Sequence, residues 1–386
     1  MVYLDFNAST PLSLEVAEVM SSVEKVTLNP GSIQHKSGLK SQAVMENARN
    51  SISEQLGVSP QELIFTSGAS EGAAIAILGV LAKLPHERRG IILSATEHKA
   101  IIQSAETARM LFNARVSVLE VDQSGLVHIE QLETLLATGT YGLVAVMRSN
   151  NETGVIQDTE LVSRLSHRHG AMFFCDVTQS IGKEDVSKVF SEADFAVFTA
   201  HKFYGPKGSG VLYARRSVQE MMQPVIGGGG QERGFRGGTP NVSGIAGMQE
   251  ALRLATGDLI RSTDNFKLLS NAFRSGLSES GVDFVEIGSG AKRLENTINL
   301  RVVGVEADAL MANMPDVEIS TGSACNSAVV EPSHVLLAHG LSVDEANQCI
   351  RISFGKSTLI EDIHFAVEEI AKAVSRIRQI ELAVQK

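Results

Sequence analysis

A lysine that follows a short apolar run is the residue of this chain with the clearest chemical use. Lys202 stands in Thr199-Ala200-His201-Lys202, directly after residues 195–198, Phe-Ala-Val-Phe. Lysine is among the residues least often buried, so a position at the end of a buried strand calls for a function. An amine held in an apolar site can form a Schiff base with a carbonyl compound. The position therefore predicts that Lys202 carries a carbonyl cofactor.

A segment of small residues could bind a phosphate group of such a cofactor. Thr66-Ser67-Gly68-Ala69-Ser70-Glu71 follows a predicted strand and opens a predicted helix. Free backbone N–H groups and the positive end of a helix favour an anion at that place, and Ser70 adds a hydroxyl donor. The same pattern also fits an ordinary helix N-cap with nothing bound, and the motif alone does not choose.

Three more side chains suit the ring of pyridoxal phosphate (PLP). Asp176 ends a predicted strand at residues 171–175, and a carboxylate there would keep a pyridine nitrogen protonated, which makes the ring an electron sink. Gln179 could bond the ring hydroxyl. His98 follows another strand and could stack on the ring and move protons. Taken alone, Asp176 and His98 also fit simple helix-start residues.

One of the three cysteines lies in an unusual setting. Cys325 stands in residues 320–327, Ser-Thr-Gly-Ser-Ala-Cys-Asn-Ser, a run that is typical of an exposed loop and could carry a reactive thiol. Buried free cysteines are the commoner case, and Cys175 and Cys349 in apolar strands fit it. The remaining histidines lack ligand-like spacing with cysteines or carboxylates, so no metal site is predicted. We interpret four of them as surface or packing residues, namely His167, His169, His334 and His339.

The elements that must position these residues alternate along the chain. Short apolar runs at 62–65, 91–94, 116–121, 143–147, 171–175, 195–198 and 210–213 are separated by helical patterns at 71–84, 98–111 and 159–169. This alternation predicts an α/β fold whose mostly parallel sheet is covered by helices on both faces. A long helix is expected at 242–280, followed by an α+β tail with strands at 297–302 and 349–353 and a last helix from residue 360.

Length and this pattern predict a large domain and a smaller one. We place an N-terminal segment at 1–25, packed on the small domain, the large cofactor-binding domain at 26–240, and the connecting helix with the small domain at 241–386.

Composition excludes several classes of protein. The net charge is −10 and no Lys/Arg-rich run is present, so direct binding of nucleic acid is not expected. No apolar run reaches the roughly 18 residues that span a bilayer. The three cysteines form no CxxC pair, which favours a reducing, cytoplasmic location.

Taken together, the motifs resemble a known family. The chain looks like a cysteine desulfurase of the NifS/IscS type, within the class V aminotransferase group of fold-type-I PLP enzymes. The resemblance covers nearly the whole chain and rests, in this order, on Tyr3-Leu4-Asp5, Ala8-Ser9-Thr10-Pro11, Asn29-Pro30, residues 66–71 and 96–100, Asn150-Asn151-Glu152-Thr153-Gly154, and residues 176–180, 201–208, 228–239, 322–327 and 350–353.

This resemblance implies a role for each position. Lys202 would form the Schiff base and move the α-proton, His98 would stack on the ring and act in acid–base steps, and Cys325 would remove the sulfur. Asp176 would pair with the pyridine nitrogen and Gln179 with the ring oxygen. The other implied contacts are Ala69, Ser70, Thr199 and His201 with the phosphate, Thr239 with the partner subunit's phosphate, and Asn151 and Arg351 with the substrate carboxylate.

The implied reaction converts L-cysteine to L-alanine and leaves a persulfide on Cys325. An obligate homodimer is implied, as is a sulfur acceptor, either a thiol or a protein of iron–sulfur cluster assembly, tRNA thiolation or DNA phosphorothioation. Two alternatives stay open. One is another PLP enzyme on the same fold, such as a selenocysteine lyase or an aminotransferase. The other is a catalytically idle scaffold or sulfur-relay partner.

Overall fold

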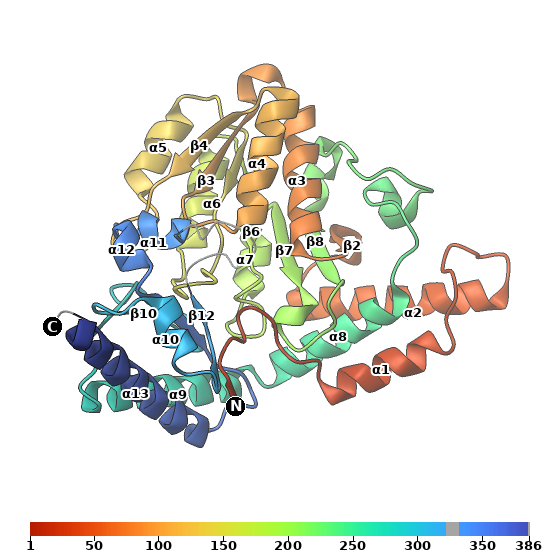
Figure 1. Cartoon of the computed structure of the whole chain (residues 1–386). Coiled ribbons are helices and arrows are strands. Elements are labelled where there is room, and N and C mark those ends of the chain that lie inside the picture. The colour runs from red at the N-terminus through yellow and green to blue at the C-terminus, as the bar shows by residue number, and fades with distance from the viewer. Residues whose placement is uncertain (322–331, 385–386) are drawn as a thin grey trace.

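A seven-stranded sheet forms the centre of the molecule in the computed structural model, which describes residues 1–321 and 332–384 (Figure 1). Five neighbouring strands run parallel, and β8 is antiparallel to the strands on both of its sides. The prediction of a mostly parallel sheet is confirmed. The strand order is β2 (Leu63–Thr66), β8 (Gly210–Ala214), β7 (Phe195–Thr199), β6 (Met172–Asp176), β5 (Leu143–Ala145), β3 (Gly90–Ser94) and β4 (Arg115–Leu119).

Both faces of this sheet are buried under helices. In β7, Phe195 and Val197 join one apolar cluster, whereas Ala196 and Phe198 join the cluster on the opposite face. Side chains alternate between the faces of a strand, so a continuous apolar run is what a sheet covered on both sides requires. One face packs against α3 (Ala69–Lys83) and α4 (Lys99–Phe112), and the other against α2 (Lys36–Leu56), α5 (Ile129–Ala137), α6 (Thr159–Arg168), α7 (Ser187–Glu192) and α8 (Val242–Gly257).

A smaller unit lies beside the large sheet and has a core of its own. Its four-stranded sheet has the order β12 (Ser320–Thr321), β13 (Cys349–Ser353), β10 (Thr297–Val302) and β9 (Phe284–Glu286). Helices α9 (Leu259–Glu279) and α13 (Ile360–Val384) pack side by side against it (Figure 1). Shorter helices complete the unit: α10 (Ala307–Ala312), α11 (His334–Ala338) and α12 (Val343–Ala346).

The N-terminal segment contacts both units. Strand β1 (Val2–Tyr3) pairs in parallel with β11 (Val317–Glu318), and Asp5 forms a further bridge with Ser353 of the small unit. The chain then crosses to the large unit, where α1 (Leu14–Glu24) packs on α8. The domain boundaries at residues 25 and 240 remain a prediction.

One expected element differs from the structure. The helix expected at 242–280 is interrupted at Asp258, which has φ −114° and ψ 12° and separates α8 from α9. Gly257 and Asp258 are poor helix formers, which explains the break at this place. Cys175 and Cys349 are buried and free, as expected. In the described part of the chain, no helix is both long and apolar enough to cross a membrane.

Candidate active site

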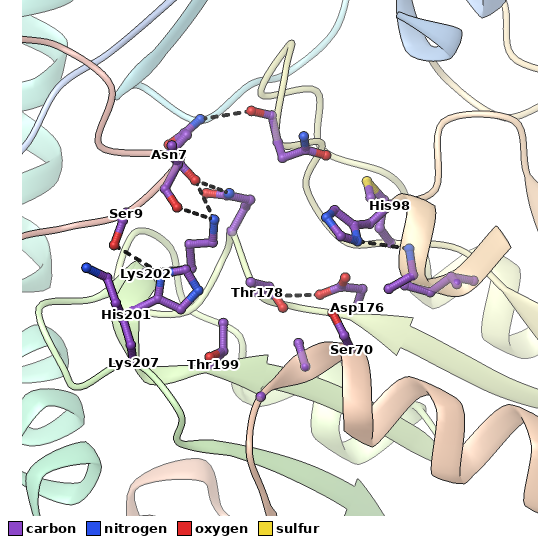
Figure 2. A pocket seen from close by; sticks show the side chains of 18 of the residues that line it. Asn7, Ser9, Ser70, His98, Asp176, Thr178, Thr199, His201, Lys202 and Lys207 are labelled. Atoms are coloured by element: carbon purple, nitrogen blue, oxygen red, sulfur yellow. Dashed lines mark hydrogen bonds between the residues drawn. The ribbon is translucent and has the colours of Figure 1, made fainter. Parts of the chain in front are cut away.

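A cavity of about 680 Å³ opens at the edge of the large sheet where the parallel strands end (Figure 2). In an α/β sheet this is the edge at which ligands bind. The cavity brings together ten of the predicted site residues, which are Ala69, Ser70, His98, Asn151, Asp176, Gln179, Thr199, His201, Lys202 and Arg351. Thr239 is exposed, and it is not among the described residues that line the cavity. Cys325 lies outside the described residues.

Lys202 ends a short 3₁₀ turn, Ala200–Lys202, that follows β7. Its Nζ donates to the carbonyl oxygens of Asn7 at 2.7 Å and Ala8 at 2.8 Å. Burial and the positive charge of Arg351 lower the pKa of the Lys202 amine to about 8, against the smaller opposing effect of nearby carboxylates. Lys202 is therefore an amine that loses its proton close to neutral pH, as a Schiff-base lysine must.

The N-terminal segment holds the whole turn that carries Lys202. Thr10 donates through both its backbone N–H and its hydroxyl to the carbonyl oxygen of His201, and the hydroxyl accepts from the N–H of Tyr204. Ser13 N–H donates to the carbonyl of Tyr204, which has a φ of 67°. These bonds keep Tyr204 in the left-handed region, where non-glycine residues are uncommon. The position of Lys202 thus depends on residues near the start of the chain.

Two acids lie near one another at this edge of the sheet, and one of them, Asp176, lines the cavity. Asp176, at the end of β6, is 7% exposed, and its Oδ1 accepts from the N–H of Thr178 at 2.8 Å. Glu97 is fully buried, and burial together with the charge of Asp176 raises the pKa of Glu97 to about 8. Two nearby carboxylates ionise together only at a cost. Glu97 is therefore protonated near neutral pH.

His98 is held in one tautomer. It is the N-cap of α4, and its Nδ1 accepts from the N–H of Ala100 at 3.1 Å, so the single proton of the neutral ring lies on Nε2. Burial lowers the pKa of His98, and the charges of Lys202 and His334 lower it further against the effect of Asp176. His98 is thus a neutral imidazole with a donor on its free side.

His334, interpreted from the sequence as a surface or packing residue, is half-buried and contacts the segment that precedes α4. Its Nε2 donates to the carbonyl oxygen of Glu97 at 2.9 Å, and the preceding Ser333 donates to Glu152 Oε2 at 2.6 Å. His334 has no ligand-like spacing with cysteines or carboxylates, so nothing in the sequence indicated these contacts. Both contacts join residues that are far apart in the chain.

One end of the cavity suits an anion. It is formed by the start of α3, whose first-turn N–H groups have no partner within the helix, together with Ser70, Thr199 and His201 (Figure 2). The Nδ1 of His201 lies 3.2 Å from the hydroxyl of Ser9. Burial and the charges of Lys202 and Lys207 lower the pKa of His201 to about 4. These cationic neighbours would favour a bound phosphate.

Arg351 projects from β13 at another wall of the cavity. Its Nη2 donates to Asp5 Oδ1 and its Nη1 to the carbonyl oxygen of Asn151 at 3.2 Å. Its Nε is buried and has no hydrogen-bond partner among the described residues. The guanidinium that these two contacts hold at the cavity wall is a planar fork of donors, which suits a carboxylate.

Gln179 uses its amide inside the protein as well as lining the cavity. Its Nε2 donates to the carbonyl oxygen of Asn7 at 3.0 Å, and its Oε1 accepts from Lys183 Nζ at 2.6 Å. Sequence reasoning missed both partners. Asn7 lies just before the recognised Ala8-Ser9-Thr10-Pro11 motif, and this neighbourhood could have pointed to it. Lys183 lies four residues after Gln179, and no motif pointed to it.

The cavity fits PLP by the chemistry of its groups. Anion donors, the Asp176 carboxyl group and the Lys202 amine all border it. The hydroxyl of Thr178 is buried and has no partner in the described part of the chain, so a polar group remains to be satisfied there. The fold and this arrangement define a PLP-dependent enzyme of fold type I.

Comparison with known proteins identifies the group. Residues 2–365 match the model of the aminotransferase class-V family. The cysteine desulfurase IscS of Vibrio vulnificus strain YJ016 is 36% identical over 386 residues, covering 98% of this chain and 94% of its own. A solved structure of a NifS-like protein superposes with a TM-score of 0.88 at 33% identity, covering 97% of this chain and 99% of its own.

A structure of SspA in complex with cysteine has a TM-score of 0.80 at 31% identity, with 93% of this chain and 100% of that one covered. The chain therefore belongs to the aminotransferase class-V family and, within it, to the cysteine desulfurases.

Proposed function

We propose that the protein removes sulfur from L-cysteine with the help of PLP, giving L-alanine and a persulfide on Cys325. The observation that carries this proposal is the cavity in which Lys202, Asp176, His98 and Arg351 meet. Membership of the cysteine desulfurases, and the SspA structure that contains cysteine, support the choice of substrate.

We assign each part of the cofactor to residues that line the cavity. The first turn of α3 with Ala69 and Ser70, together with Thr199 and His201, would hold the phosphate, and Asp176 would pair with the pyridine nitrogen. Gln179 would face the ring oxygen and His98 the ring itself. When bound, PLP supplies an electron sink for the pair of electrons left on the substrate after a proton is removed.

Lys202 is suited to moving the proton at the α-carbon of the substrate. Its pKa of about 8 leaves part of the amine unprotonated at neutral pH, and this form is the base. The carbonyl oxygens of Asn7 and Ala8 accept from the protonated form and hold it beside the reacting carbon.

Arg351 and Asn151 would orient the substrate through its carboxylate. The pairing with Asp5 keeps the guanidinium plane of Arg351 in place before substrate arrives. A carboxylate bound there fixes the amino acid by one end, which leaves its α-hydrogen to Lys202 and its thiol free for Cys325.

Cys325 would receive the sulfur. The Sγ of Cys325 would form a bond with the substrate sulfur while the Cβ–S bond of the substrate breaks. The electron pair of the broken bond stays on Cβ, where a proton joins it to form a C–H bond of alanine. A cysteine of ordinary pKa is only a few per cent thiolate at pH 7, so a base must take the proton. His98 would act in these steps as a proton donor, because its Nε2 carries the proton while its Nδ1 accepts from the N–H of Ala100.

Assembly and sulfur delivery complete the proposal. Thr239 is exposed, which suits the predicted contact with the phosphate of a second copy in a homodimer. The persulfide would pass in the cytoplasm to a thiol or to an acceptor protein. The IscS relative supports an iron–sulfur scaffold as one such acceptor.

The experiment that tests the function measures alanine and sulfide from L-cysteine with the PLP-loaded protein. Lys202→Ala should lower the rate at least about 10³-fold, because both the attachment of PLP and the proton transfer depend on that amine. Lys188→Ala, a change at an exposed lysine of α7, is the matched control and should keep the wild-type rate. A protein that binds no PLP, or a Lys202→Ala variant with the normal rate, would overturn the proposal.

A further inference from the structure

Lys183 is a buried amine that the reaction described above does not use. It lies in the turn between β6 and α7, and its Nζ donates to Gln179 Oε1 at 2.6 Å and Asn7 Oδ1 at 3.2 Å. Among residues 1–321 and 332–384 it forms no ion pair, so both of its partners are neutral amide oxygens. Burying a lysine without a carboxylate is costly, and this arrangement needs a reason.

The amide of Gln179 is held at two points. Lys183 donates to its oxygen, while the carbonyl oxygen of Asn7, which can only accept, receives a bond from its nitrogen. A carboxamide turned by 180° would place its oxygen against the Asn7 carbonyl and leave that contact repulsive. The two contacts therefore select a single orientation of the Gln179 side chain.

The selected orientation brings the amide nitrogen next to the reacting amine. Gln179 Nε2 and Lys202 Nζ both donate to the same oxygen, the carbonyl of Asn7, at 3.0 and 2.7 Å. An NH₂ group has two hydrogens, and only one is used in this contact. Within the described residues the second N–H of Gln179 has no partner, and Gln179 lines the same cavity as Lys202.

We propose that Lys183 is a positioning residue that, together with the Asn7 carbonyl, turns the Gln179 amide so that an N–H faces the PLP ring oxygen beside Lys202. This inference rests on the proposed function, because it assigns PLP to the cavity. Lys183 itself touches neither cofactor nor substrate and acts through Gln179.

The surroundings of Lys183 agree with this role. Burial, together with the charges of Lys202 and Arg351, lowers the pKa of Lys183 well below its ordinary value. A neutral amine has two N–H groups, and Lys183 has two amide oxygens to receive them. Asn7 Oδ1 also accepts from Asn296 Nδ2 at 3.2 Å, so it keeps a donor if Lys183 is replaced, whereas Gln179 Oε1 does not within the described chain.

A double-mutant cycle with the PLP-loaded protein tests the proposal without substrate. The variants are Lys183→Met, Gln179→Leu and the double variant, and the readouts are the dissociation constant of PLP and its absorption spectrum. Lys183→Met should weaken PLP binding about five- to tenfold and shift the absorption band, because the loss of one hydrogen bond allows the amide to turn. The dissociation constant of PLP in the double variant should equal that of Gln179→Leu within about twofold, since Lys183 acts through Gln179.

Two outcomes would overturn the inference. Lys183→Met could leave PLP binding and the spectrum unchanged, or it could cause the same loss in the Gln179→Leu background as in the wild type. Lys188→Met is the matched control and should change neither readout. Wild-type protein that binds no PLP would instead refute the proposed function, so the two failures are distinguishable.

A measurement on the wild type covers the case in which Lys183→Met does not fold. An atomic-resolution crystal structure of the PLP-loaded protein separates the oxygen and nitrogen of an amide by their bond lengths. Gln179 Nε2 toward the ring oxygen is expected, and Oε1 in that place would contradict the inference.

Discussion

The amine of Lys202 donates to the carbonyl oxygen of Asn7, a residue 195 positions earlier in the chain, at 2.7 Å. Asn7 is also bound by Gln179 and Lys183, and its own Nδ2 donates to the carbonyl oxygen of Asn151 and to Thr297 Oγ1. One asparagine thus links the lysine with the residues proposed to contact the ring oxygen and the substrate carboxylate.

The capture of PLP by the apoprotein should depend on pH with a midpoint near 8. The amine attacks the aldehyde only when it is unprotonated, and the pKa of Lys202 is lowered to about 8 from the ordinary 10.5. The initial rate of capture, followed by absorbance, should therefore rise from pH 6.5 to 9 and then level off. A rate that still climbs steeply above pH 10 would show an ordinary lysine and contradict this prediction.

Replacing Cys325 should separate cofactor binding from sulfur transfer. Cys325→Ala should keep the absorption of bound PLP and still show a spectral change with L-cysteine, because neither needs the thiol. Production of sulfide should cease. Cys175→Ala is a poor control because Cys175 lies in the core of the large sheet, so Cys325→Ser serves for comparison and should be equally inactive. Unchanged turnover by Cys325→Ala would assign the nucleophile to another residue.

Arg351 should govern recognition of the substrate carboxylate. Arg351→Met should raise the KM for L-cysteine about 10- to 100-fold, which is the usual effect of losing hydrogen bonds to a charged group. Cysteamine lacks the carboxylate, so its dissociation constant should change much less. Spectral titration measures the dissociation constants of L-cysteine and of cysteamine. Arg301→Met is the matched control, because Arg301 lies on the neighbouring strand β10 and pairs with Glu345. Equal losses of affinity for L-cysteine and cysteamine would contradict the assignment of Arg351 to the substrate carboxylate.

A buried ion pair away from the cavity should dominate the stability of one corner of the large unit. Arg49 in α2 makes a two-pronged contact with Glu232, whose Oε2 also accepts from the N–H of Phe65 in β2. Both side chains are almost fully buried, so Arg49→Met leaves a carboxylate without its partner and should cost about 3–5 kcal/mol.

Urea unfolding followed by circular dichroism measures that loss. Arg253→Met breaks an exposed pair with Glu250 on α8 and should cost no more than about 1 kcal/mol. Adding Glu232→Gln to Arg49→Met should recover part of the stability, since it removes the unpaired charge. Similar losses for Arg49→Met and Arg253→Met would contradict the prediction.

The inner strands of the large sheet were predictable because both of their faces are apolar. Residues 195–198 and 143–147 read as continuous apolar runs, and the observed β7 and β5 differ from them only at the ends. Asp176 and His98 were predictable in the same way, since each follows a strand at the edge where ligands bind. The break at Asp258 was missed because helical periodicity continues on both sides of it.

The parts of the site that depend on distant contacts could not be predicted from patterns. Lys183 and His334 lie in segments without a distinguishing motif, and their importance comes from what the fold places beside them. Asp5 stood in a recognised motif, but nothing in the sequence paired it with Arg351, which is 346 positions away. A local pattern reports propensity and burial, whereas these contacts are set by the packing of two units.

The bridging position of the N-terminal segment also bears on how the protein is made. Residues 1–13 are made before most of the fold, yet their partners include Val317, Arg351 and Ser353, which follow more than 300 positions later. The large sheet can form during translation, because its strands end at residue 214. The contacts that anchor Asn7 and Asp5 cannot be completed until β13 has emerged, so we expect the carbonyl groups that bind the Lys202 amine to be fixed in place only after β13 has been made.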